Sequence, residues 1–138
     1  MSEKKSPSMD EWLKEAKADP NADKCGMYLV HNGVVRSTAK AIARGLAEPG
    51  ADAAKEIVTS MEFSYDANKV ESVIEETYRM EGIWFVKVWL NEGHLEVGDD
   101  IMYVMIGGDI RPRVVDALNF LVGTIKDTCV IEKECYEN

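Results

Sequence analysis

Hydrophobic residues recur at helical spacing in one stretch near the C-terminus. After Pro112, six apolar residues fall on one side of a helix: Val114, Val115, Leu118, Leu121, Val122 and Ile125. Proline suits the first turn of a helix, where its missing N–H would have no partner anyway. The pattern therefore predicts a helix from about Pro112 that brings Lys126 to its last turn, then a short strand from Cys129 that carries Lys133.

Two runs rich in aromatic and β-branched residues, 83–90 and 101–106, have the composition of strands. A turn-rich stretch, 91–99, separates them, so we expect neighbouring antiparallel strands. The pair Gly107-Gly108 is expected to end the second strand.

The first half of the chain predicts two capped helices. Ser8 to Glu11 has the S-x-x-E form of a capping box, and the helix it starts ends near Pro20. Asp66 can cap a second helix through about Met80, because valine and isoleucine fall on one face of that segment and glutamates on the other.

Extended structure is predicted at 26–36 and 56–63, with a helical segment, Ser37 to Ala47, between them. In the first strand, Asn32-Gly33 permits either a type I′ hairpin turn or a glycine bulge. Segregated strands and helices favour an α+β sandwich, with a mainly antiparallel sheet, over a doubly wound parallel sheet. We expect a flexible N-terminus at 1–8 and a single domain at 9–138.

Composition narrows the class of function. The formal net charge is -9, which argues against nucleic acid as a partner, because a basic face supplies most of that affinity. No apolar stretch is long enough to span a bilayer, and the start has no signal-peptide core, so we expect a cytoplasmic protein that does not bind membranes. Three cysteines form no disulfide or zinc pattern, which indicates a packing role.

Four cations stand out against this acidic background: Arg36, Arg111, Lys126 and Lys133. Arg36 closes the first strand, and Arg111 opens the C-terminal helix. Their convergence in one cleft would make a site for phosphates or carboxylates. The two histidines, His31 and His94, lie far apart and have no nearby cysteine spacing, so we predict no metal site.

In chain order, these segments resemble the large, catalytic subunit of molybdopterin synthase from about Trp12 to Cys135. The residues that carry the resemblance are His31 to Arg36 (F-x-G-x-V-R in the family), Met61 to Ser64 (L-E-H-Y), Leu95 to Asp99 (L-x-x-G-D), Arg111, and the lysines at 126 and 133. No single motif is specific, but their ordered spacing covers most of the chain. The family fold implied is an α/β-hammerhead-like sandwich with packed helices.

The resemblance implies an enzyme that transfers sulfur from the C-terminal thiocarboxylate of a small ubiquitin-like subunit, ending in Gly-Gly, to cyclic pyranopterin monophosphate. The product is the dithiolene of molybdopterin. The resemblance also implies a homodimer of large subunits within a heterotetramer and no permanently bound cofactor.

By the same resemblance, Lys126 is expected to be the catalytic lysine and Lys133 its partner at the substrate or thiocarboxylate. Arg36 and Arg111 are expected to bind anions. Simpler explanations exist for three of them. The helix dipole alone favours Lys126 at a helix end, Lys133 is typical of a solvated edge strand, and Arg111 can pair with a nearby aspartate.

The chain also departs from the family pattern. Ile110 replaces a histidine, Phe63 and Ser64 replace a histidine-tyrosine pair, and Glu132 replaces an aromatic residue. Two alternatives to the enzyme therefore stay open: a non-catalytic relative that binds a ubiquitin-like tail or a phosphorylated small molecule, and a dimerisation module without a site.

Overall fold

The strands of the protein form two three-stranded antiparallel sheets, ordered β1-β5-β3 and β4-β2-β6. The computed structural model describes residues 4–38 and 57–136. The strands of the first sheet are β1 (Met27–Val34), β3 (Ile83–Leu90) and β5 (Asp100–Gly108), and those of the second are β2 (Val58–Tyr65), β4 (Gly93–Glu96) and β6 (Val130–Tyr136). The predicted α+β class is confirmed, with the strands shared between two sheets.

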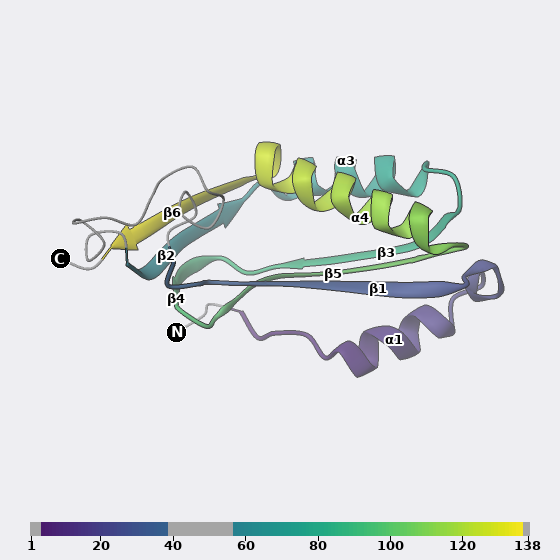
Figure 1. The fold of residues 1–138 in the computed structure, drawn as a ribbon, viewed down its shortest axis with the longest axis horizontal. Coiled ribbons are helices and arrows are strands. Elements are labelled where there is room, and N and C mark those ends of the chain that lie inside the picture. Colours follow the sequence, from purple (N-terminus) through teal and green to yellow (C-terminus); the bar gives the residue numbers. More distant parts are fainter. Residues whose placement is uncertain (1–3, 39–56, 137–138) are drawn as a thin grey trace.

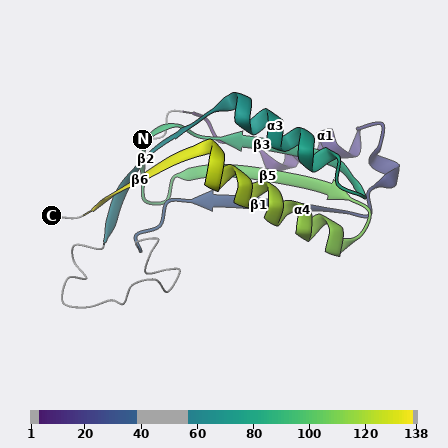
Figure 2. The ribbon, with the colours of Figure 1, turned by 90° about the horizontal axis from the view of Figure 1, so that it is seen from above.

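Helices cover both faces of the first sheet (Figure 1). Helices α3 (Ala67–Tyr78) and α4 (Arg111–Thr124) lie on one face, and α1 (Met9–Lys17) lies on the other. Figure 2 shows α3 and α4 side by side across the sheet, with β2 and β6 extending past their ends. A short 3-10 helix, η1 (Ala22–Lys24), precedes β1. In the described parts of the chain, no helix is long and apolar enough to cross a membrane.

Both predicted helix caps are present. The Ser8 hydroxyl accepts a hydrogen bond from the Glu11 N–H at 3.3 Å. The Asp66 carboxylate accepts from the N–H groups of Asn68 and Lys69 at 3.0 and 3.2 Å. These bonds satisfy backbone donors that a helix cannot pair within itself, which fixes where α1 and α3 begin.

Two apolar cores hold the layers together. The larger lies between the sheets and the pair α3 and α4, and its most buried side chains include Leu95, Ile106 and Leu121. The smaller lies under α1, where Trp12 and Ala16 pack against Phe85 and Met105. Cys129 is buried in the larger core, as the packing role predicts, whereas Cys25 and Cys135 are only half-buried.

The second strand does end at the pair Gly107-Gly108, as expected, but both glycines belong to β5 and are paired within the sheet. Gly107 pairs with Tyr28 and Gly108 pairs with Met27 on β1. A side chain at Gly107 would overlap the ring of Tyr28. The two glycines thus permit close approach of neighbouring groups within a strand, rather than a turn.

The stretch 91–99 is also more ordered than expected, since it contains β4. Buried Asn91 marks the crossing from one sheet to the other: its amide donates to the Asp100 carbonyl at 2.8 Å, and its backbone N–H donates to the Ile101 carbonyl at 2.9 Å. β4 then pairs with β2 rather than with its neighbours in sequence. The four-residue strand carries no local signal, because its partner lies some thirty residues earlier.

Three further expectations concern Asn32-Gly33, the segment from Ser37 to Ala47 and the N-terminus. Asn32-Gly33 lies within one continuous strand with a register shift between Gly33 and Val34, so the hairpin alternative is excluded. Of the helix predicted from Ser37 to Ala47, only Ser37 and Thr38 are among the described residues, and the rest lies outside them. The N-terminus, expected to be flexible over 1–8, makes contacts from Lys4 onward: Lys4 Nζ donates to the Tyr65 hydroxyl at 2.9 Å and to the Leu90 carbonyl at 2.6 Å.

Candidate functional site

A cavity of about 290 Å³ opens where the two sheets meet the C-terminal end of α4. Its charged and polar side chains are His31, Arg36, Lys126, Glu132 and Glu134, and Met61 and Met102 contribute apolar wall. The walls come from both sheets, because β1 and β5 supply one side and β2 and β6 supply the other.

Lys126 reaches the cavity from a π-helical turn, η3 (Ile125–Cys129), that follows α4 directly. Ile125 and Cys129 are buried at the two ends of the turn, and half-buried Lys126 lies between them. The Thr128 hydroxyl donates to the Thr124 carbonyl at 2.8 Å across the turn. Such turns often occur at functional sites, because they displace one side chain from the regular helical position.

Arg36 and His31 come from the end of β1 and the residues just after it. His31 and Gly33 share the strand face that points towards α4, as expected from the two-residue alternation of a strand. Backbone bonds hold the following segment: the Val35 N–H donates to Asp99 at 3.0 Å, and the Val35 carbonyl accepts from Gly98 at 2.8 Å. The structure thus brings Arg36 and Lys126 into one cavity, and these are two of the four cations whose convergence was hypothesised from the sequence.

The cavity has mixed charge rather than a purely positive lining. Glu132 and Glu134 alternate along β6 and face the same space as Lys126. Burial lowers the pKa of His31 below its ordinary value of 6.5, and the charge of Lys126 lowers it further. The imidazole is therefore neutral near pH 7, and it shares the cavity with an arginine, a lysine and two carboxylates.

The lowered pKa of His31 predicts a pH-dependent contribution to stability. Well above pH 6.5 the imidazole is neutral in both folded and unfolded chains, and it contributes nothing to the pH dependence. As the pH falls below 6.5, the unfolded chain takes up this proton first, so the free energy of unfolding decreases. Denaturation at several pH values should show this decrease in the wild type and its loss in His31→Phe. An unchanged pH dependence in His31→Phe would contradict the shift.

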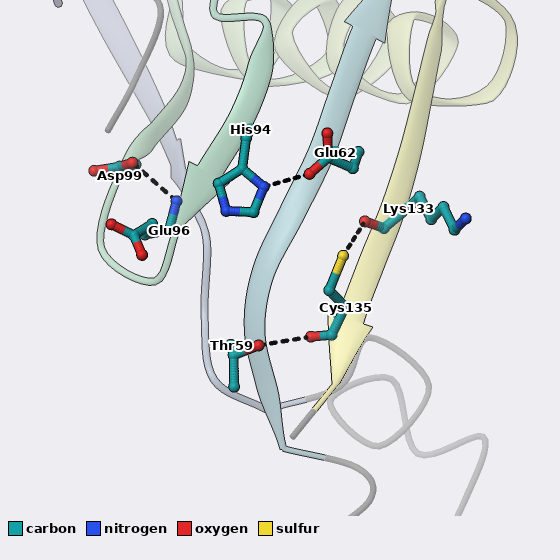
Figure 3. Close-up of polar contacts among 7 residues, drawn as sticks. All are labelled: Thr59, Glu62, His94, Glu96, Asp99, Lys133 and Cys135. Carbon is teal, nitrogen blue, oxygen red and sulfur yellow. Dashed lines mark hydrogen bonds and ion pairs between the residues drawn. The ribbon is translucent and has the colours of Figure 1, made fainter. Parts of the chain in front are cut away.

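Lys133 does not line this cavity, although the resemblance makes it the partner of Lys126. It lies on the opposite face of β6 from Glu132 and Glu134, in register with Glu62 on β2, which is in turn in register with His94 on β4. Figure 3 shows the contact between His94 Nδ1 and the Glu62 carboxylate on this outer face, with the ammonium group of Lys133 pointing away from it.

Arg111 is also remote from the cavity within one chain. It begins α4, fifteen residues before Lys126 in the sequence. At 1.5 Å of rise per residue this is roughly 22 Å along the axis. The ion pair expected for Arg111 is made by its neighbour instead: Arg113 bonds Asp109 at 2.6 Å and lies 3.5 Å from Glu81.

The departures from the family pattern fall in different surroundings. Phe63 is buried in the larger core, and Ile110 is an exposed residue preceding the first turn of α4, so neither lines the cavity. Glu132 does line it. Among the described residues, no group of three or more histidine, cysteine, aspartate or glutamate side chains is arranged to hold a metal ion.

Sequence reasoning missed two groups in the cavity, His31 and Glu134. Strand alternation was the available signal. His31 is two residues from Gly33, within the segment that leads to Arg36, and Glu134 is two residues from Glu132. The same alternation places Lys133 on the other face of β6, so it does not line this cavity.

These observations define an α+β protein of two antiparallel sheets, with a candidate anion site where the sheets meet. The sequence profile of the MoaE protein family matches residues 3–128. The chain therefore belongs to the MoaE protein family, whose members act in molybdopterin biosynthesis. The match includes Arg36, Arg111 and Lys126 but ends before Lys133.

Solved structures agree on the fold. Molybdopterin synthase from Staphylococcus aureus superposes with a TM-score of 0.69 at 16% identity, covering 96% of this chain and 88% of that one. The molybdopterin biosynthesis MoaE protein from Burkholderia ambifaria gives 0.67 at 16% identity, covering 96% and 84%. A complex of subunits 1 and 2 of molybdopterin-converting factor from Helicobacter pylori gives 0.61 at 14% identity, covering 96% and 82%. A comparison with curated protein sequences finds no match.

Proposed function

We propose that this chain is the catalytic subunit of a molybdopterin synthase. It would transfer sulfur from the C-terminal thiocarboxylate of a small ubiquitin-like subunit to cyclic pyranopterin monophosphate, forming the molybdopterin dithiolene. The observation that carries the proposal is the meeting of Arg36 and Lys126 in one cavity, within a chain that belongs to the MoaE family. The converting-factor complex from H. pylori supports a second, different subunit as partner.

The two cations of the cavity suit this chemistry in different ways. The substrate carries a phosphate and the partner carries a thiocarboxylate, so the reaction needs donors for anionic oxygen and sulfur. The guanidinium of Arg36 is planar and permanently charged, and it can bind a phosphate through two parallel bonds. Lys126 can hold an anion as a point charge and can also serve as acid, base or nucleophile, which arginine cannot do.

Lys133 and Arg111 do not line the cavity, and in this proposal each contacts another subunit. Exposed Lys133, on the outer face of β6, is suited to contact the small subunit rather than the bound pterin. Exposed Arg111, at the start of α4, would bind an anion brought by a second subunit. We propose a homodimer of this chain within a heterotetramer in the cytoplasm.

A second candidate function is a relative that binds a ubiquitin-like tail or a phosphorylated small molecule without turnover. Its support comes from Glu132 and Glu134, whose carboxylates share the cavity with Arg36 and Lys126. Like charges repel a phosphate and thiocarboxylate, so these two residues weaken the case for an efficient anion site.

Product formation separates the two candidates. The purified chain is mixed with cyclic pyranopterin monophosphate and the thiocarboxylated Gly-Gly-ending subunit from the same organism, and molybdopterin is measured. Formation of molybdopterin would show that the chain is the enzyme. Binding of the small subunit without product supports the non-catalytic relative, and the absence of both binding and product contradicts both candidates.

Removing the guanidinium of Arg36 should weaken substrate binding more than turnover. A hydrogen bond to a charged group contributes about 1.5–3 kcal/mol, so Arg36→Ala should raise KM for the pterin by roughly 10- to 100-fold. Arg36→Lys keeps the positive charge but loses the pair of parallel hydrogen bonds, so its KM should lie between those of the wild type and Arg36→Ala. Exposed Arg79 at the end of α3 provides the matched control. An equal rise in KM for Arg79→Ala would show that only net charge matters.

A further inference from the structure

The ammonium group of Lys4 is held by groups from β2 and β3. Lys4 Nζ donates to the Leu90 carbonyl oxygen at 2.6 Å and to the Tyr65 hydroxyl at 2.9 Å. It also lies 5.0 Å from the ring centroid of Tyr65 and 5.8 Å from that of Trp89. A cation is attracted to the face of an aromatic ring within about 6 Å of its centroid. Two oxygen acceptors and two rings thus meet at one nitrogen atom.

The walls around Lys4 match a lysine side chain along its length. Tyr65, Trp89 and Leu90 line a cavity of about 210 Å³ together with one face of α3. That face contributes apolar side chains and one carboxylate, Glu71. Lysine needs both kinds of surface, because its methylenes favour apolar contact and its ammonium favours hydrogen-bond acceptors and negative charge. The cavity is therefore suited to a primary ammonium on an alkyl chain.

The segment that carries Lys4 is fixed at a second point, Ser6. The Ser6 hydroxyl donates to the Asp100 carboxylate at 2.5 Å, and the same carboxylate accepts from the Asn32 amide at 3.1 Å and from the Tyr103 hydroxyl at 3.3 Å. In Figure 1 the segment before α1 runs along the first sheet towards β4. Lys4 is thus presented to its cavity on a short tether, and such tethers give effective concentrations in the millimolar range.

The contacts of Lys4 join the two sheets. Tyr65 ends β2, in the second sheet, whereas Leu90 ends β3, in the first. The chain crosses from the first sheet to the second directly after Leu90, at buried Asn91. The ammonium group therefore bridges the sheets at their crossing point. Lys5, the next residue, has the same charge but is exposed, so the arrangement is specific to Lys4.

We propose that this cavity is a binding site for a primary ammonium group, and that Lys4 fills it to form a latch between the two sheets. The Leu90 carbonyl and the Tyr65 hydroxyl accept two N–H donors, and the rings of Tyr65 and Trp89 stabilise the charge. The latch depends on that charge, so acylation of the Lys4 amine, which removes it, opens the latch. This inference goes beyond sulfur transfer and does not depend on it.

Chemical rescue tests the site directly. Lys4→Ala removes three carbons and the amine, and propylammonium chloride supplies the same fragment from solution. The NMR signals of the indole N–H groups are followed, because the chain has three tryptophans and Trp89 is the one at the site. We expect the Trp89 signal of Lys4→Ala to shift saturably, with a Kd of about 1–10 mM. The wild type, whose site is filled, should show no such shift at the same concentrations.

The latch should also appear in the stability of the protein. Lys4→Ala and the neutral variant Lys4→Gln should each lower Tm by about 5 °C. Propylammonium should restore part of this loss in Lys4→Ala, whereas sodium chloride at the same concentration should not. Lys5→Ala is the matched control, because it removes the same charge from an exposed position and should keep the wild-type Tm. An equal loss in Lys5→Ala would assign the effect to overall charge and overturn the latch.

Two comparisons separate an ammonium site from an apolar cavity. Propanol has the same length without the charge, so it should not bind Lys4→Ala. Tyr65→Phe, added to Lys4→Ala, keeps the ring but removes the hydroxyl, and it should weaken propylammonium binding roughly 10-fold. The absence of a saturable shift with propylammonium, or an equal shift with propanol, overturns the inference.

The wild type decides if Lys4→Ala does not fold. Nuclear Overhauser contacts between the ε-methylene protons of Lys4 and the ring of Trp89 are expected, and their absence overturns the latch. None of these readouts is molybdopterin formation, so failure of the latch and failure of the proposed function are separate results.

Discussion

Replacing Lys126 by alanine is expected to reduce molybdopterin formation by about 10²- to 10⁴-fold, the range that one acid–base group contributes. The side chain extends into the cavity from a turn whose ends, Ile125 and Cys129, are buried in the core. Truncating it removes a cation and a proton-transfer group and leaves the anchors of the turn in place. The measurement is product formed at saturating small subunit, with thermal denaturation to show that the fold is retained.

Two further variants sharpen this test. Lys126→Arg keeps the positive charge but cannot act as acid, base or nucleophile, so it should bind the pterin and still fail to turn over. Lys133→Ala removes a lysine from the outer face of β6, and its effect should appear in affinity for the small subunit. Wild-type turnover by Lys126→Arg would reduce Lys126 to a binding residue.

Gly108→Ala is expected to destabilise the protein by about 3 kcal/mol, the upper range for overpacking a core. A Cβ at this position would lie 2.7 Å from the Gly82 carbonyl oxygen and 2.7 Å from Val114 Cγ2. One neighbour is backbone and the other is a fully buried side chain, so neither can move aside easily. Thermal denaturation should show a loss of roughly 10 °C in Tm.

The control for this prediction is Gly123→Ala in α4. A Cβ on Gly123 meets nothing within 4 Å, and the residue is exposed. Alanine is favoured over glycine in a helix by about 0.8–1 kcal/mol, so this variant should be more stable than the wild type. Opposite shifts in Tm for the two glycines are the expected result, and a Gly108→Ala protein as stable as the wild type would contradict the packing argument.

Local sequence patterns predicted the elements whose signals are local. The caps at Ser8 and Asp66, the proline at the start of α4 and the strand at 83–90 all appear where expected. The features that local patterns did not predict depend on pairing with residues far away in the sequence. The pairing of Gly107 with Tyr28 inside the sheet could not be read from the glycines themselves, and β4 has no strand signal until β2 is placed beside it.

The same division applies to the candidate site. Arg36 and Lys126 were predicted to converge, and they line one cavity. Lys133 was grouped with them by its spacing, but alternation along β6 places it on the other face. His31 was set aside because its sequence neighbours include no metal-ligand pattern. Its position in the wall of the cavity exists only after folding.

Because the cavity lies at the junction of the two sheets, a ligand bound in it contacts both of them. One wall is built by β1 and β5, and the facing wall is built by β2 and β6. A ligand that contacts Arg36 and the facing wall together can bind only while the two sheets are packed against each other. Its binding therefore raises the free energy of unfolding of the whole chain, by an amount that grows with ligand concentration relative to Kd.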